Sequence, residues 1–246
     1  MLPDLVSAWP DRLLSFWTPW WWFICHHSKR VENRGQPYSF RGAFWIHASL
    51  NSDKNLMDVV RDTITAIPLP RGRNRPTEDV LAANAGHIVG RARIVGCELN
   101  TPRVCLGDRW AIEGSHGIKL EAVEPLLVSI PWKGAQGLVK VDPMDVAIVK
   151  TITEQGGVLI PSSRDSMRDL VALYVRNGAE ATWAIQEALP SRLAGLVSQG
   201  QLRLEGGRYF VRDYSARLSA EFKKKPPTPP DAPPAPDAPA QGSFGW

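Results

Sequence analysis

Short apolar runs rich in Val, Ile, Phe and Trp recur between residues 41 and 141, with Gly or Pro near their ends. This pattern is typical of β-strands rather than of one face of a helix. The predicted strands are residues 43–48, 87–99, 117–123 and 138–141. Over residues 55–67 the apolar positions instead follow a helical period. The pattern therefore predicts a small β-barrel decorated by one or two helices.

Beyond residue 143 the hydrophobic pattern becomes helical. It predicts helices over residues 145–154, 163–176 and 180–189. Pro190 favours the first turn of a further helix, residues 190–199, which stops at Gly200.

A β-hairpin is predicted to follow these helices. Residues 201–205 and 208–212 flank a Gly-Gly pair, a two-residue turn that would place Leu204 opposite Tyr209 and Leu202 opposite Val211. Several helices followed by a short hairpin resemble a winged helix-turn-helix domain. Residues 223–246 open with three lysines and continue with eight prolines, a composition that predicts a disordered tail.

These patterns together predict an α+β protein of two folded units and a tail. The expected boundaries are residues 1–143 for the β-barrel unit, 144–222 for a winged-helix-like unit and 223–246 for the Pro-rich tail. The length of 246 residues is compatible with one or two domains.

Composition excludes several classes of protein. Hydrophobic residues make up 43% and charged residues 22%, which excludes a wholly disordered or fibrous chain. No apolar run approaches the ~18–20 residues of a membrane span, and residues 1–4 lack the features of a signal peptide. We therefore expect a cytoplasmic protein without a membrane partner. Three cysteines without C-x-x-C spacing indicate neither disulfides nor a zinc site, and we expect no metal and no cofactor.

The charge is distributed unevenly. Residues 1–143 hold 17 Lys and Arg against 14 Asp and Glu, whereas residues 144–222 hold nine of each. In the first region Arg outnumbers Lys by 12 to 5, and the planar guanidinium suits phosphate oxygens and stacks on bases. The composition favours RNA or DNA as a partner of the first unit.

An ordered set of segments in this region resembles the ASCH domain, a family with a PUA-like barrel. The matching segments are PWWWFI (19–24), KRVENR (29–34), YSFRG (38–42), IHAS (46–49), GHIVGRA (86–92), IKLE (118–121), IP (130–131) and GAQGL (134–138). The resemblance covers residues 15–142. It implies a nucleic-acid or nucleotide ligand, since PUA-like folds include readers of RNA and of modified bases.

The candidate binding residues centre on Lys29, Glu32 and Arg34. They combine a point cation, an acceptor and a forked donor within six positions, a set that can hold a phosphate and a base edge. The alternative is a solvated ion cluster of little consequence. The remaining candidates are Arg41, Trp20, Trp21, His47 and Tyr38.

The aromatic candidates and His47 have structural alternatives. Trp20 to Trp22 are consecutive, so most are expected in the core, while one could edge a cleft and stack on a base. His47 follows an apolar run and could be an ordinary buried histidine. Arg71, Arg73 and Arg75 lie in a predicted loop that could contact phosphates or merely be solvated.

Three functions are open at this stage. We favour a non-catalytic reader of an unstacked or modified base, with a protein-protein adaptor as one alternative. An RNA-processing enzyme is the other, either a ribonuclease using Lys29, Glu32 and Tyr38 or Ser39, or a nucleoside amidohydrolase. Amidohydrolase relatives place a threonine nucleophile three residues after the lysine, where this chain has Glu32.

The predicted helix 190–199 offers Ser191, Arg192, Ser198 and Gln199 to a DNA major groove. Its surroundings are electrically neutral, although duplex binding normally requires a basic face. A unit that binds a protein partner is therefore an equal alternative.

Overall fold

The structure is a computed structural model that describes residues 9–52, 55–176 and 182–215. The Pro-rich tail, residues 223–246, lies outside the described residues. The elements of the first unit are β1 (Arg12–Thr18), α1 (Trp20–His26), β2 (Val31–Arg34), β3 (Gly42–Ser52), α2 (Leu56–Ala66), α3 (Glu78–Ala83), β4 (His87–Leu99), α4 (Pro102–Gly107), β5 (His116–Pro131) and β6 (Leu138–Lys140). The elements of the second unit are α5 (Pro143–Glu154), β7 (Val158–Leu159), α6 (Arg164–Arg176), α7 (Thr182–Ser198), β8 (Leu202–Glu205) and β9 (Arg208–Val211).

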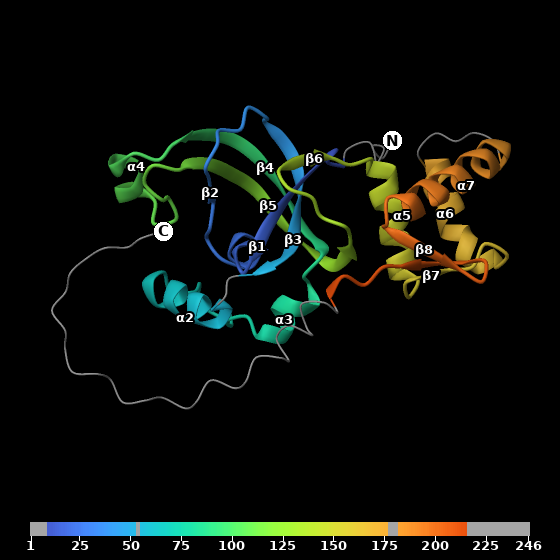
Figure 1. The fold of residues 1–246 in the computed structure, drawn as a ribbon, viewed down its shortest axis with the longest axis horizontal. Coiled ribbons are helices and arrows are strands. Elements are labelled where there is room, and N and C mark those ends of the chain that lie inside the picture. The colour runs from blue at the N-terminus through green and yellow to red at the C-terminus, as the bar shows by residue number, and fades with distance from the viewer. Residues whose placement is uncertain (1–8, 53–54, 177–181, 216–246) are drawn as a thin grey trace.

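The protein is an α+β fold built on one mixed six-stranded sheet (Figure 1). Its strand order is β2-β5-β4-β3-β1-β6, with β1 parallel to β3 and the other neighbours antiparallel. Strands β4 and β5 arch strongly, so the sheet curls around a hollow (Figure 1). Among the described strands the two edges, β2 and β6, do not pair, so the sheet stays open and the predicted β-barrel is not closed.

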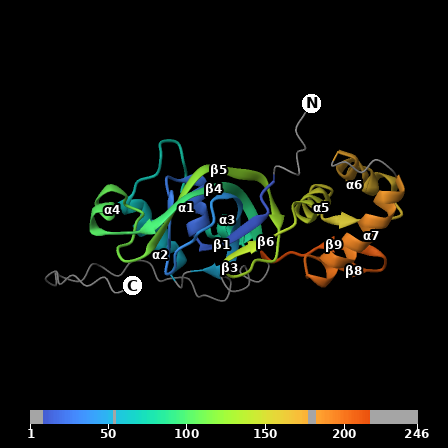
Figure 2. The ribbon, with the colours of Figure 1, turned by 90° about the horizontal axis from the view of Figure 1, so that it is seen from above.

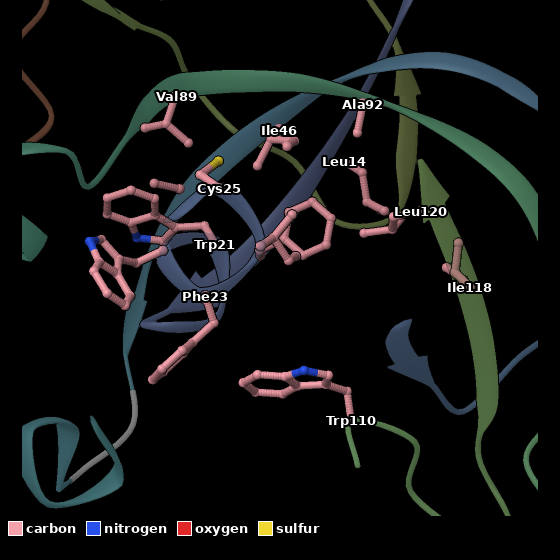
Figure 3. Close-up of a cluster of buried hydrophobic side chains, with 14 of the residues drawn as sticks. Leu14, Trp21, Phe23, Cys25, Ile46, Val89, Ala92, Trp110, Ile118 and Leu120 are labelled. Atoms are coloured by element: carbon pink, nitrogen blue, oxygen red, sulfur yellow. The ribbon is translucent and has the colours of Figure 1, made fainter. Parts of the chain in front are cut away.

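The hollow of the sheet is filled by α1 and its aromatic side chains. Residues 21–25 of this helix are all buried, as expected for a helix that is apolar on every side. Figure 3 shows Trp21 and Phe23 among side chains from β1, β3, β4 and β5, with Trp110 closing the cluster from a loop. The tryptophan-rich segment is thus mainly core.

The second unit contains a three-stranded antiparallel sheet of order β7-β9-β8. The predicted hairpin is confirmed, with Leu204 opposite Tyr209 and Leu202 opposite Val211. The prediction of a new helix starting at Pro190 is wrong, because α7 runs through this residue. Although proline removes a helical hydrogen bond, burial of Leu189, Leu193 and Leu196 in the core stabilises the continuous helix.

One hydrophobic cluster joins the two units. It combines Leu13, Trp45 and Trp132 of the first unit with side chains from α5, α6, α7 and β8. Helix α5 lies between the large sheet and the rest of the second unit in both views (Figures 1 and 2). Helices α2 and α3 contribute Leu56, Val60 and Leu81 to the other cluster.

No helix in the described part of the chain is long and apolar enough to cross a bilayer.

Candidate functional site

Lys29, Glu32 and Arg34 converge on one another, as the sequence predicted. Lys29 Nζ lies 3.3 Å from Glu32 Oε2, and Arg34 Nε lies 3.2 Å from Glu32 Oε1. Edge strand β2 carries Glu32 and Arg34, and Lys29 precedes it in the turn after α1. One carboxylate therefore serves two cations, which leaves this triad with a net charge of +1.

Lys29 is a buried structural cation. Only 4% of its side chain is exposed, and Nζ lies 5.8 Å from the ring centroids of both Trp20 and Trp110. Nζ also donates a hydrogen bond to the carbonyl of Val31. Burial lowers the pKa of Lys29, and the neighbouring Glu32 opposes this effect. In this position Lys29 orients Glu32 and is out of reach of a ligand.

Arg34 is the member of the triad that reaches a cavity. Its side chain is 26% exposed, Nη2 donates to the carbonyl of Ser15 at 2.8 Å, and the guanidinium lies 5.6 Å from the Phe16 ring centroid. Held by Glu32, Ser15 and Phe16, the guanidinium has a fixed orientation before any ligand arrives. Such preorganisation reduces the entropy lost on binding.

The cavity has a volume of about 810 Å³ and lies where β1, β2, β3 and the loop of residues 132–137 meet. This volume is within the range of small-molecule sites, ~300–1,000 Å³. Arg34 and Lys133 both line the cavity, and no Asp or Glu is among its described lining residues. Trp17, which is 55% exposed, forms part of the rim. The cavity is thus suited to an anion that carries a flat group.

His47 lies in the cavity wall, with a polar neighbour at hydrogen-bond distance from each ring nitrogen. Nδ1 is 3.0 Å from Ser15 Oγ, and Nε2 is 2.9 Å from the carbonyl oxygen of Trp132. Burial lowers the pKa of His47 to about 4, so the ring is neutral at physiological pH. A serine beside a histidine can act as a nucleophile, but so weak a base activates it poorly at neutral pH.

The loop of residues 132–137 is held by contacts on two sides. A Cβ at Gly134 would lie 2.2 Å from Cε1 of His47, so only glycine allows this close approach. On the other side, the amide of Lys133 donates to Oε1 of Gln201 at 2.7 Å. The second unit therefore anchors a wall of the cavity.

The second unit also contributes a residue to the cavity itself. Tyr214 lines the cavity, and its hydroxyl donates to the carbonyl of Gly200. A Cβ at Gly86 would lie 2.3 Å from Cβ of Tyr214, which requires glycine at this contact.

The other predicted site residues lie apart from the cavity. Arg41 is exposed and donates to the carbonyls of Tyr38 and Phe40. Tyr38 packs against the core, and its amide donates to Sγ of Cys97.

Trp21 is 1% exposed, whereas Trp20 is half-buried beside Lys29. Of the eight predicted residues, only Arg34 and His47 line the cavity.

Two arginines of the second unit are paired with carboxylates. Arg192 donates to Asp142 and Asp145 at 2.7 and 2.9 Å, and Arg203 contacts Glu205 at 2.8 Å. Arg208, Ser191, Ser198 and Gln199 are exposed. Pairing reduces the positive charge that Arg192 and Arg203 present to a duplex.

The arginines of the loop after α2 are exposed. Arg71, Arg73 and Arg75 lie between α2 and α3, as the sequence predicted. The positive charge of Arg73 assists burial in lowering the pKa of His26.

Sequence reasoning missed Ser15, Trp17, Lys133 and Tyr214 as cavity residues. Strand β1 gave no alternating signal, because Leu13 and Leu14 are both buried. The GAQG stretch was noticed only as part of the ASCH resemblance.

No model of a known protein family matches the chain, and no curated protein matches it in sequence. The ASCH resemblance is therefore still a prediction.

No group of three or more potential metal ligands occurs in the described part of the chain.

Proposed function

We propose that this protein binds single-stranded nucleic acid and takes one nucleotide into the cavity of the first unit. Arg34 and Lys133 contact the phosphate, and Trp17 stacks on the base. The observation that carries this proposal is the charge of the cavity, which has two cations and no carboxylate among the described residues of its wall. Phosphate contacts of this kind supply most of the affinity for nucleic acid.

Two further observations support the same proposal. The large sheet stays open but curls around a helix, and this curl supports the PUA-like architecture that the ASCH resemblance implies (Figure 1). Trp17 keeps 55% of its surface exposed on the rim, although tryptophan gains much from burial. An exposed indole beside a cationic cavity is the arrangement on which unstacked bases pack.

For the second unit we propose a winged-helix-like module that supports the cavity and binds a partner. Its element order, α5-β7-α6-α7-β8-β9, and its sheet order support the winged-helix assignment. Pairing of Arg192 and Arg203 with carboxylates favours a partner other than duplex DNA.

The test is a fluorescence-anisotropy titration of the full chain with labelled single-stranded RNA, single-stranded DNA and duplex DNA. We expect single strands to bind more tightly than the duplex, with affinity falling as salt rises. Trp17→Ala should weaken binding about tenfold, the typical contribution of one stacked base. Leu99→Ala, which removes a similarly exposed apolar side chain at the end of β4, 51% exposed and outside the cavity lining, is the matched control.

The proposal would be contradicted if no single strand bound, or if both variants lost the same amount of affinity for single strands. Appearance of cleavage products during the titration would instead favour the RNA-processing enzyme.

A further inference from the structure

The hydroxyl of Ser15 lies between two groups that both need its single proton. Oγ is 3.0 Å from Nδ1 of His47 and 3.0 Å from the carbonyl oxygen of Ala135. A carbonyl oxygen can only accept a hydrogen bond, whereas an imidazole nitrogen accepts or donates according to its tautomer. The tautomer of His47 therefore decides the role of Ser15.

The contact with Trp132 fixes that tautomer. Nε2 of His47 lies 2.9 Å from the carbonyl oxygen of Trp132, so Nε2 must carry the proton. The ring is 2% exposed and neutral at physiological pH, which leaves Nδ1 with a lone pair only. Both neighbours of the Ser15 hydroxyl are then acceptors.

This arrangement leaves the cavity wall with more acceptors than protons. Whichever neighbour receives the Ser15 proton, the lone pairs of Oγ and one further acceptor stay available. Because Ser15 already donates its only hydroxyl proton to one of these neighbours, its Oγ can only accept a hydrogen bond from a ligand. A ligand that fills the cavity without a donor at this place leaves an acceptor buried and unpaired, which costs free energy, whereas a donor satisfies it.

We infer that Ser15 selects ligands with a hydrogen-bond donor, namely nucleotides whose base carries an exocyclic amino group. This inference rests on the proposed function and names the base class that the cavity prefers. An amino group is a pure donor and matches a wall of acceptors, whereas a keto oxygen at the same place would face other lone pairs. Cytosine and adenine are therefore favoured over uracil and hypoxanthine.

The neighbouring contacts hold Ser15 in place for this task. Its carbonyl accepts from Nη2 of Arg34 at 2.8 Å, so the residue that meets the phosphate also fixes the strand that carries the acceptor. The His47 ring packs against Gly134, where no side chain fits. The phosphate and base contacts thus belong to one rigid wall.

The experiment compares matched mononucleotides by isothermal titration calorimetry on the full chain. Cytidine and uridine monophosphate differ in amino against keto and in the adjacent ring nitrogen, which is an acceptor in the amino base and a donor in the keto base, and so do adenosine and inosine monophosphate. We expect the amino member of each pair to bind about tenfold more tightly. Ser15→Ala should abolish this preference by weakening only the amino ligands, and Ser15→Thr, which keeps the hydroxyl, should retain it.

The outcomes separate this inference from the proposed function. Equal binding within both pairs, in a protein that still binds nucleotides, would overturn the inference alone. Weaker binding of deoxycytidine monophosphate than of cytidine monophosphate, together with equal binding of amino and keto bases, would assign the donor to the sugar hydroxyl. This result would also overturn the inference. Absence of binding by any nucleotide would overturn both. Thermal melts of the variants establish that they are folded.

Discussion

Two triads of charged side chains, one in each unit, have opposite compositions. In the first, Glu32 lies between the cations Lys29 and Arg34. In the second, Arg192 lies between the carboxylates of Asp142 and Asp145. The first triad has a net charge of +1, and the second has −1.

The comparison shows that an arginine is available to an anion according to its partners. Glu32 is shared, so Arg34 keeps part of its charge for the cavity, whereas Arg192 is more than neutralised. Burial differs as well, since Lys29 and Glu32 side chains are 4% and 12% exposed, whereas Arg192 and Asp142 are 35% and 45% exposed and only Asp145, at 14%, is comparably buried. The Lys29–Glu32 pair is therefore costly to disturb, and the Arg192–Asp142 pair is not.

The largest contrast in stability is expected between removing the central carboxylate of the first triad and removing a flanking carboxylate of the second. Glu32→Gln leaves two cations without a counter-charge, one of them buried, and should lower the free energy of unfolding by about 3–5 kcal/mol. Asp142→Asn breaks a mostly solvated pair and should cost less than about 1 kcal/mol. Urea denaturation at pH 7.5 measures the free energy of unfolding of both variants. Equal decreases in the two would remove the distinction between the triads.

The cavity wall should also respond to pH through His47. Its pKa in the folded protein is about 4, below the ordinary 6.5, so between these values only the unfolded chain binds the proton. The free energy of unfolding should therefore fall as pH drops from 6.5 to about 4, by on the order of 3 kcal/mol. Denaturation of the protein and of His47→Gln at pH 7.5 and 5 measures the first part of this loss, about 2 kcal/mol.

The His47 variant should lose less stability on acidification than the parent protein. Burial also lowers the pKa of His87, and this contribution is present in both proteins and cancels in their difference. An identical pH dependence in the two proteins would show that His47 titrates normally.

A smaller effect is expected on ligand affinity. Arg34→Gln removes the guanidinium from the cavity and should weaken binding of a single-stranded oligonucleotide about tenfold, with a flatter salt dependence. Arg192→Gln should leave both quantities unchanged. Anisotropy titrations at two salt concentrations make the comparison, and a matching loss in Arg192→Gln would place the nucleic acid on the second unit.

The smallest effect concerns the contact between the units. Gln201→Ala leaves the amide of Lys133 without its acceptor and should cost about 1 kcal/mol of stability. Because this amide belongs to the cavity loop, oligonucleotide affinity should fall roughly threefold as the loop loses its fixed position. Gln199→Ala, an exposed position at the end of α7, is the control.

Local pattern alone determined much of the fold. Strand β4 begins and ends where its apolar run does, and the Gly-Gly turn set the register of β8 and β9. Strand β1, which lies beside edge strand β6, and the continuous helix α7 were not predictable in this way. In β1 the adjacent Leu13 and Leu14 are both buried, which interrupts the alternation, and in α7 burial of its leucines overrides the helix-breaking effect of Pro190.

The candidate site divides in the same manner. The sequence kept Lys29, Glu32 and Arg34 within about 17 Å of one another, since an extended residue spans ~3.3–3.6 Å. The spacing of two residues within a strand also places Glu32 and Arg34 on one face, whereas the ion pairs among the three were decided by the fold. Only the tertiary structure decided that Arg34 alone faces the cavity, and that Ser15, His47 and Lys133 meet there from segments more than 30 residues apart. Which side chains share a cavity follows from how the sheet curls and from what holds each loop, and neither property is encoded in local spacing.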